Sequence, residues 1–127
     1  MLIQTATPAA LTSLGLLIAA AGVTVATEVG FMALVGYRRQ VFLVVCGLAN
    51  LASNLALNLT LALTPDQWRL GLLPALELGV VVAEWAVLRL VVDGPPPPPV
   101  RSRTSLRLAL ATVAANALSY SIGLLLF

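Results

Sequence analysis

Four long apolar stretches, separated by short polar segments, make up most of the chain. A helix that crosses a bilayer needs about 20 mostly apolar residues, since each residue rises about 1.5 Å across a hydrocarbon core of about 30 Å. All four stretches are long enough, and they predict spans at about 8–36, 41–63, 72–92 and 106–127. The pattern therefore predicts an all-α fold, a polytopic membrane four-helix bundle that forms a single transmembrane domain over 1–127.

Polar residues predict how the helices begin and end. Thr7 is in place to cap the first helix, with Pro8 at its first position and Gly36 at its end. The segment Thr64-Pro65-Asp66-Gln67 has the spacing of a capping box, and it predicts a short interfacial turn that includes Trp68. The first basic residue, Arg38, follows the whole first apolar stretch, so we expect this stretch to be retained rather than cleaved as a signal peptide.

Composition supports the membrane interpretation and narrows the chemistry. The chain is 60% hydrophobic and 9% charged, whereas soluble domains carry about 25% charged residues. It has no histidine and one cysteine, Cys46, so the commonest general base and metal ligand are missing and no internal disulfide forms. We expect no enzymatic activity, no cofactor and no metal site. A net charge of +2 is too small for binding nucleic acid through its phosphates.

Arginines predict the orientation of the chain. By the positive-inside rule, Arg38 and Arg39 after the first span, and Arg101 and Arg103 before the fourth, are topology anchors on the cytoplasmic side. This places both termini outside, in a bacterial inner membrane, and makes 93–105 a cytoplasmic proline-rich loop. Its five consecutive prolines favour a stiff polyproline II spacer.

Matching motifs indicate an internal repeat of two helical hairpins. Glu28-Val29-Gly30 resembles Glu77-Leu78-Gly79, and Ala49-Asn50-x-x-Ser53 resembles Ala115-Asn116-x-x-Ser119. Both hairpins enter from the same side, so the repeat is parallel, with an axis along the membrane normal. Counting helix rise from the nearest arginine or cytoplasmic helix start predicts one polar layer near the midplane, formed by Glu28, Glu77, Asn50 and Asn116.

Carboxyl groups within the spans are the strongest functional candidates, because an ionisable residue at the bilayer centre costs roughly 2.5 to 3.5 kcal/mol. Glu77 and Glu84 share a face of the third span, with Glu84 nearer the cytoplasm. Burial favours the neutral form of a carboxyl, and a second carboxyl nearby adds to this effect. One interpretation is a proton or cation site, in which Glu28 and Glu77 bind and Glu84 relays to the cytoplasm. The other is that protonated carboxyls hydrogen-bond between helices or meet another subunit.

Amide and hydroxyl side chains extend the candidate site. Asn50, Asn54 and Asn58 follow one another at steps of four, which predicts a polar ridge along the inner face of the second span. On the fourth span, Tyr120 shares a face with Asn116, beside Ser119, and its hydroxyl needs a partner such as Glu77 or Glu28. These residues either coordinate a cation or polar solute or hold the helices together.

Small residues form a seam along the first span that permits close approach of another helix. The seam points away from Glu28, so it packs against another helix of the chain or against a second copy. Its residues are Gly15, Ala19, Gly22 and Ala26.

The polar pattern as a whole resembles that of small four-span membrane proteins encoded in many bacterial genomes. The likeness covers about 28–127 and rests on Glu77-x6-Glu84, the asparagine run of the second span, and Asn116-x2-Ser119-x3-Gly123. The resemblance implies a recurring fold and nothing about the chemistry of the protein.

Two functions from different classes fit the sequence. The first is a proton- or cation-linked transporter or channel-like protein with an intramembrane Glu/Asn site, in a homo-oligomer. The second is a non-catalytic structural or assembly subunit of a larger membrane complex. In both cases the lipid bilayer is a partner, and in the first a small cation or polar solute is the cargo.

Overall fold

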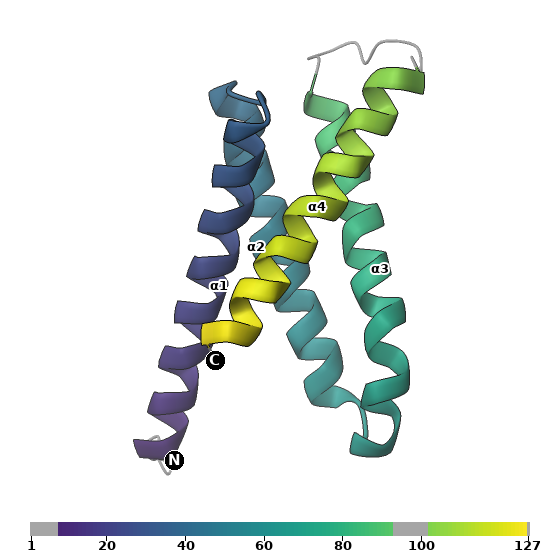
Figure 1. Cartoon of the computed structure of the whole chain (residues 1–127). Coiled ribbons are helices and arrows are strands. Elements are labelled where there is room, and N and C mark those ends of the chain that lie inside the picture. The colour runs from purple at the N-terminus through teal and green to yellow at the C-terminus, as the bar shows by residue number, and fades with distance from the viewer. Residues whose placement is uncertain (1–7, 93–101, 127) are drawn as a thin grey trace, which may run out of the picture.

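The computed structural model describes the backbone of residues 8–92 and 102–126, and the side chains of 15–92 and 105–126. Over this part of the chain it contains four helices and no strand. The helices are α1 (Pro8–Leu34), α2 (Gln40–Leu63), α3 (Asp66–Val91) and α4 (Ser102–Leu126), shown in Figure 1. The expected all-α architecture of four helices is confirmed.

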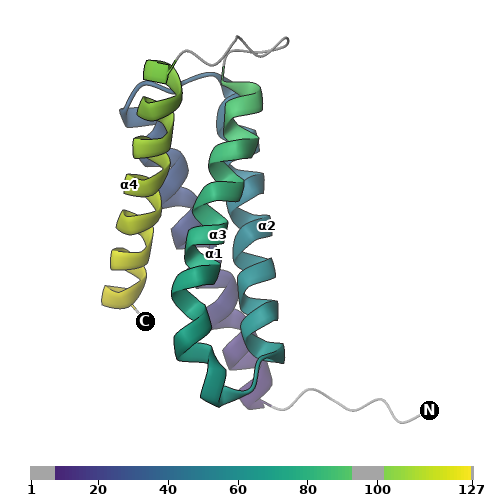
Figure 2. The same ribbon diagram turned by 90° about the vertical axis from the view of Figure 1, so that its right-hand side faces the viewer.

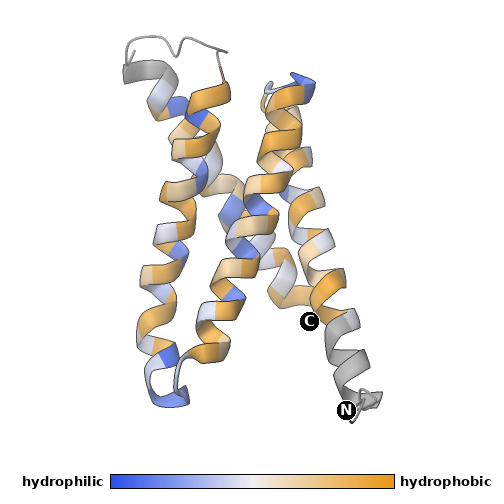
Figure 3. Cartoon of the chain, turned by 180° about the vertical axis from the view of Figure 1, so that it is seen from behind, coloured by the Kyte–Doolittle hydropathy of each residue, from blue (hydrophilic) through white to orange (hydrophobic). Residues whose placement is uncertain are grey.

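All four helices are long and apolar enough to cross a membrane. Their outward surfaces are rich in leucine and valine, and some of these side chains are almost wholly exposed, such as Leu70 and Leu125 at 85% each. The most hydrophilic positions along the helices lie largely at mid-length or near the ends (Figure 3). Soluble proteins rarely expose apolar surface on this scale. The distribution fits a multi-pass membrane protein whose outer surface meets lipid.

The helices pack in a four-sided arrangement. α1 contacts α2 and α4, and α3 contacts α2 and α4. The ends of α1 and α3 lie at the same end of the bundle, together with the starts of α2 and α4, and the α2–α3 turn lies at the opposite end (Figures 1 and 2). We call the first of these the arginine end, because Arg38, Arg39, Arg89 and Arg107 lie there. Helix α4 runs obliquely, from α3 at the arginine end towards α1.

The apolar core occupies the half of the bundle at the arginine end. All four helices contribute to it, and the side chains of Phe42 and Leu108 are almost completely enclosed. Met32, Phe42, Leu88 and Leu108, one from each helix, are almost fully buried together, so this half of the bundle is closed. The buried core residues are Met32, Phe42, Cys46, Leu88, Leu108, Ala111 and Ala115.

Gly36 ends α1, as its position predicts. Its φ of 109° lies in the left-handed region that favours glycine. The Tyr37 N–H donates to the Met32 carbonyl at 2.9 Å and the Gly36 N–H to the Ala33 carbonyl at 3.3 Å, which is the hydrogen-bond pattern of a Schellman motif. This motif turns the chain sharply into α2.

Arginines cap helix ends across the two helical hairpins, which are α1 with α2 and α3 with α4. Arg107 of α4 donates to the Val35 carbonyl after α1 at 3.0 Å, and Arg39 before α2 donates to the Val92 carbonyl after α3 at 3.4 Å. A cation at a helix C-terminus interacts favourably with the helix dipole. The second helix of each hairpin is therefore tied to the first helix of the other.

The predicted capping box at 64–67 is wrong. The Thr64 hydroxyl donates backwards to the Thr60 carbonyl at 2.7 Å, and the cap residue of α3 is Pro65, which has no side-chain capping bond. α3 begins at Asp66, ahead of the predicted span. The residues expected to form an interfacial turn are therefore its first helical turn. Within this turn Asp66 and Arg69 form an ion pair of 2.8 Å. Pro65 occupies the N-cap position, with φ −56° and ψ 141°, and the helix begins at the next residue.

Several predicted features lie outside the described residues. These are the Thr7 cap, the prolines of the 93–105 loop, Arg101 and the side chain of Arg103. The small-residue seam of α1 is described, and all four of its residues are exposed. A Cβ added at Gly15 or Gly22 meets no atom within 4 Å, so no other described helix packs against the seam.

Candidate functional site

Polar side chains are buried at mid-length of the bundle, directly beside the apolar core. Two carboxyl groups are among them, from Glu28 of α1 (3% exposed) and Glu84 of α3 (4% exposed). Burying a carboxyl in an apolar environment costs free energy, so a buried carboxyl usually has a structural or functional role. These two carboxyls are therefore functional candidates. The other buried polar side chains are Asn50, Thr112 and Ser119.

Glu84 receives a hydrogen bond at each carboxyl oxygen. Ser53 of α2 donates to its Oε1, and Asn116 of α4 donates to its Oε2 at 2.7 Å. Glu84 therefore joins α3 to both of the helices that pack against it.

Glu28 has matching neighbours. Ser119 of α4 donates to its Oε1 at 2.7 Å, and the Asn50 amide of α2 lies beside the carboxyl. Asn50 is completely buried, and its Nδ2 has no partner in hydrogen-bond geometry among the described residues. Each glutamate thus has a serine from the other hairpin and an asparagine from its own.

Both serines are bonded in a way that accommodates a proton on the carboxyl. The Ser53 hydroxyl also lies 3.0 Å from the Asn50 carbonyl oxygen, and the Ser119 hydroxyl lies 3.0 Å from the Asn116 carbonyl oxygen. A hydroxyl has one proton to donate and lone pairs that accept. When the carboxyl is ionised, the hydroxyl donates a hydrogen bond to it. When the carboxyl is protonated, the hydroxyl accepts a hydrogen bond from it and donates its own proton to the backbone carbonyl.

Each buried carboxyl is bonded by a serine of the other hairpin, Glu28 by Ser119 and Glu84 by Ser53. Rotation of a serine hydroxyl is enough to satisfy either charge state, and no heavy atom needs to move. The arrangement is therefore chemically able to bind and release a proton.

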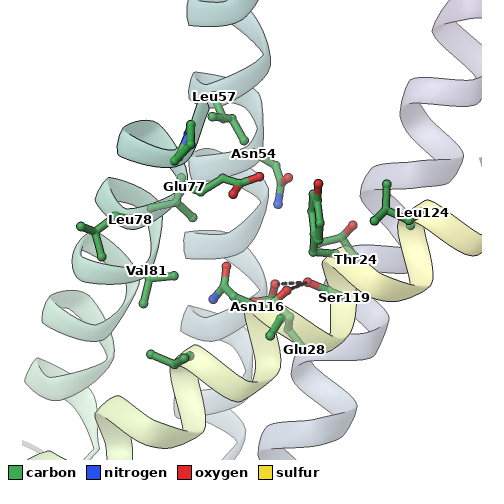
Figure 4. A pocket seen from close by; sticks show the side chains of 16 residues that line it. Thr24, Glu28, Asn54, Leu57, Glu77, Leu78, Val81, Asn116, Ser119 and Leu124 are labelled. Atoms are coloured by element: carbon green, nitrogen blue, oxygen red, sulfur yellow. Dashed lines mark hydrogen bonds between the residues drawn. The ribbon is translucent and has the colours of Figure 1, made fainter. Parts of the chain in front are cut away.

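A cavity of about 600 Å³ opens beside Glu28, in the half of the bundle away from the arginine end. All four helices contribute to its walls, and Glu77, Asn54, Thr24, Asn116 and Ser119 surround it (Figure 4). Glu84 is absent from the lining. Glu28 therefore faces the cavity, and Glu84 lies behind it on the side of the apolar core.

Glu77 occupies a different place from the expected layer. It is half-buried on the cavity wall, and its carboxyl makes no hydrogen bond to the described residues. The structure pairs Asn116 with Glu84 instead. The sequence estimate counted depth from Arg89, but that residue lies inside the last turn of α3, with its guanidinium 5.5 Å above the Trp85 ring. Counted from the ends of α1 and α3 at the arginine end, Glu28 and Glu84 lie at similar depths. Glu77 lies about two helical turns further from that end.

The asparagine ridge of α2 drifts from the core to the surface. Asn50 is buried, Asn54 borders the cavity and Asn58 is exposed. Asn54 donates to the Asn50 carbonyl and side-chain oxygens at 3.0 and 3.1 Å, and Asn58 donates to the Asn54 carbonyl at 2.9 Å. The drift follows from steps of four residues on a helix of 3.6 residues per turn.

On α4, Asn116, Ser119, Tyr120 and Gly123 all line the cavity, on the face that their spacing predicts. The Tyr120 hydroxyl makes no hydrogen bond to the described residues, so the expected bond to Glu77 or Glu28 is not formed. Tyr120 is 52% exposed, and its ring forms part of the cavity wall.

Ser53 and Thr24 join the site although sequence reasoning did not select them as site residues. The signal for Ser53 was present, because it occupies the same place in its motif as Ser119. Thr24 carries no such signal: its hydroxyl donates to the Ala20 carbonyl at 3.0 Å, as hydroxyls in apolar helices commonly do. Among the described residues, no group of three or more Cys, Asp or Glu side chains is arranged to hold a metal ion.

Comparison with known proteins finds no family model, no curated protein and no solved structure that matches this chain.

Proposed function

We propose that this protein is a small carrier that moves a cation across a bacterial inner membrane in exchange for protons, with Glu28 and Glu84 as the proton-binding groups. The observation that carries the proposal is the matched bonding of these two buried carboxyls. Each has a serine whose hydroxyl lies within hydrogen-bond distance of both the carboxyl and a backbone carbonyl. A hydroxyl so placed can satisfy the carboxyl in either protonation state.

Access to Glu28 from one side supports a carrier. The cavity reaches Glu28 from the half of the bundle away from the arginine end, while the core around Phe42 and Leu108 closes the other half. A carrier needs a site that is open to one side at a time. The described arrangement corresponds to one such state.

An internal duplication is part of the proposal. The alignment that the contacts support matches Glu28 with Glu84, in place of the Glu28–Glu77 match of the sequence motifs. The arginine caps also cross between the hairpins. Arg107 of the second hairpin caps α1, and Arg39 of the first hairpin caps α3. Repeats of this kind frame central sites in many transporters. The further matched positions are Met32 with Leu88, Phe42 with Leu108, Cys46 with Thr112, Asn50 with Asn116 and Ser53 with Ser119.

The test is proton movement in vesicles that contain the purified protein and a trapped pH-sensitive dye. Acid-loaded vesicles receive Na⁺, K⁺, guanidinium or tetraphenylphosphonium outside, and the initial rate of internal alkalinisation is measured. At least one cation is expected to raise the rate above that of protein-free vesicles. In Glu84→Gln the rate falls to the protein-free level, because an amide cannot exchange a proton.

Glu84→Gln is a suitable variant because an amide has the hydrogen-bonding pattern of a protonated carboxyl. Its oxygen accepts from Asn116 and its NH₂ donates to the Ser53 oxygen, so the fold is kept. Asp66→Asn is the matched control, because Asp66 is an exposed carboxylate at the opposite end of the bundle from the arginine end, and its rate should equal that of the unaltered protein. Equal rates in Glu84→Gln, or no response to any of the four cations, would refute the proposal. A stoichiometric protein partner isolated in mild detergent, with no flux, would favour an assembly subunit.

A further inference from the structure

We infer that the cavity binds an organic cation that carries apolar substituents, with Glu77 and Glu28 as the negative groups. This rests on the proposed carrier function and specifies its cargo. The inference begins with the cavity's size, because about 600 Å³ is in the range that encloses a drug-sized molecule.

The sign of the charge follows from the lining. Glu28 of α1 and Glu77 of α3 face the cavity, and no arginine or lysine is among its lining residues. Figure 4 shows Glu77 extending into the cavity on the side of Asn54. Two carboxyls without a basic neighbour repel an anion and attract a cation.

The available hydrogen-bonding groups argue against a neutral polar solute. Most polar groups of the wall are already engaged: Thr24 with Ala20, Asn54 with Asn50, Ser119 with Glu28 and Asn116 with Glu84. A sugar or amide needs several free partners to replace its water. Among the lining side chains, those of Glu77 and Tyr120 make no hydrogen bond to the described residues.

The apolar part of the wall argues for an organic rather than an inorganic cation. A bare metal ion needs several oxygen ligands converging within about 2.6 Å, and in the part of the chain that the structure describes no group of three Cys, Asp or Glu side chains is placed to hold one. The remaining wall instead offers hydrocarbon, with the Tyr120 ring as a face for cation–π contact. The apolar lining residues are Leu57, Pro74, Leu78, Val80, Val81, Val113, Ala117 and Leu124.

The test is equilibrium binding of radiolabelled tetraphenylphosphonium to the detergent-solubilised full chain. We expect saturable binding, and none for tetraphenylborate, which has nearly the same shape and the opposite charge. Glu77→Gln should weaken binding about tenfold or more, because a charge pair in a partly dry site is lost. The Glu77 carboxyl makes no hydrogen bond to the described residues, so its replacement by an amide should not destabilise the fold.

A second pair of variants tests the location. A Cβ at Gly123 or Gly79 meets no atom within 4 Å, and both glycines lie inside helices, but only Gly123 lines the cavity. Gly123→Leu should fill the cavity and abolish saturable binding, while Gly79→Leu binds as the unaltered protein does.

Acidification should weaken binding, because a protonated carboxyl carries no charge. The titratable groups that face the cavity are Glu28 from α1, Glu77 from α3 and Tyr120 from α4, and α2 contributes the uncharged Asn54. Glu84 lies behind Asn116 and interacts with Glu28.

The outcomes separate this inference from the carrier function. Equal binding of tetraphenylborate, or binding unaffected by Glu77→Gln and Gly123→Leu, refutes the organic-cation site, even if Na⁺ or K⁺ drives proton exchange in vesicles. Saturable, charge-selective binding without any cation-driven proton movement supports the site and refutes the carrier.

Discussion

In the proposed carrier, two serine hydroxyls adjust to the charge state of the buried carboxyls. Ser53 and Ser119 each approach both a glutamate oxygen and the carbonyl oxygen of an asparagine in their own helix. The Asn116 NH₂ group, by contrast, donates in the bonds that it makes here, to Glu84 and to the Thr112 carbonyl. In the proposed carrier, the serines are positioning residues for proton exchange.

Ser53→Ala should slow cation-driven proton exchange about tenfold, because the ionised Glu84 then loses one of its two donors, worth about 1.5 kcal/mol for a bond to a charged group. Ser53→Thr keeps a hydroxyl and should restore most of the rate. The measurement is the initial rate of dye response in vesicles over a range of pH. A merely structural serine would lower the amount of folded protein without changing the pH profile.

Some of this residue-scale chemistry was accessible from the sequence. Glu28, Glu84 and Asn116 stand out because lipid disfavours such side chains. The partnership of Glu84 with Ser53 was not accessible, since it depends on the rotation of α2 against α3. No local pattern encodes the relative rotation of two helices.

At the scale of the helices, the ends are determined locally and the packing is not. Gly36 ends α1 through a Schellman motif that is readable from a glycine after an apolar run. The start of α3 was misjudged, because Thr64 bonds back to its own helix rather than forward.

Gly36→Ala should destabilise the protein by about 1 to 2 kcal/mol, because φ is 109° there and a Cβ is strained in that region. Gly30→Ala is the control: it lies inside α1, its added Cβ meets no atom within 4 Å, and it should be neutral or slightly stabilising. Thermal unfolding in detergent measures both. Equal effects of the two substitutions would mean that the turn does not need a left-handed residue.

Packing at the arginine end can be tested with two leucines on one turn of α4. Leu108 is completely buried and Leu110 is 61% exposed. Leu108→Ala should cost about 2 kcal/mol or more, because a cavity forms between the helices, whereas Leu110→Ala should change stability by less than about 0.5 kcal/mol. Denaturant unfolding of the two variants in the same detergent gives the comparison. A larger loss in Leu110→Ala would place the core on the other face of α4.

At the scale of the whole molecule, the two hairpins are joined through each other's polar groups. The Glu28–Ser119 and Glu84–Ser53 bonds both cross between hairpins, as do the Arg107 and Arg39 caps. The hairpins are therefore interlocked at the centre and at the arginine end, and the cavity lies in the half beyond the glutamates.

The proposed duplication predicts that these two crossing bonds contribute similarly. Double-mutant cycles that combine Glu28→Gln with Ser119→Ala, and Glu84→Gln with Ser53→Ala, should each give a coupling energy of about 0.6 to 2 kcal/mol. Thermal or denaturant unfolding provides the four free energies for each cycle. A coupling in one pair and none in the other would show that the matching contacts are not energetically equivalent.

The sequence by itself determined four apolar helices and the presence of acidic residues within them. Hydrophobicity and helical hydrogen bonding are local properties, so a window of about 20 residues contains the necessary information. Only the tertiary structure decided that Glu84, and not Glu77, lies level with Glu28, and that Glu77 borders a cavity. Those outcomes depend on the oblique path of α4 and on the lengths of α1 and α3 beyond their glutamates. The path of α4 arises from side-chain packing between helices that are distant in the chain.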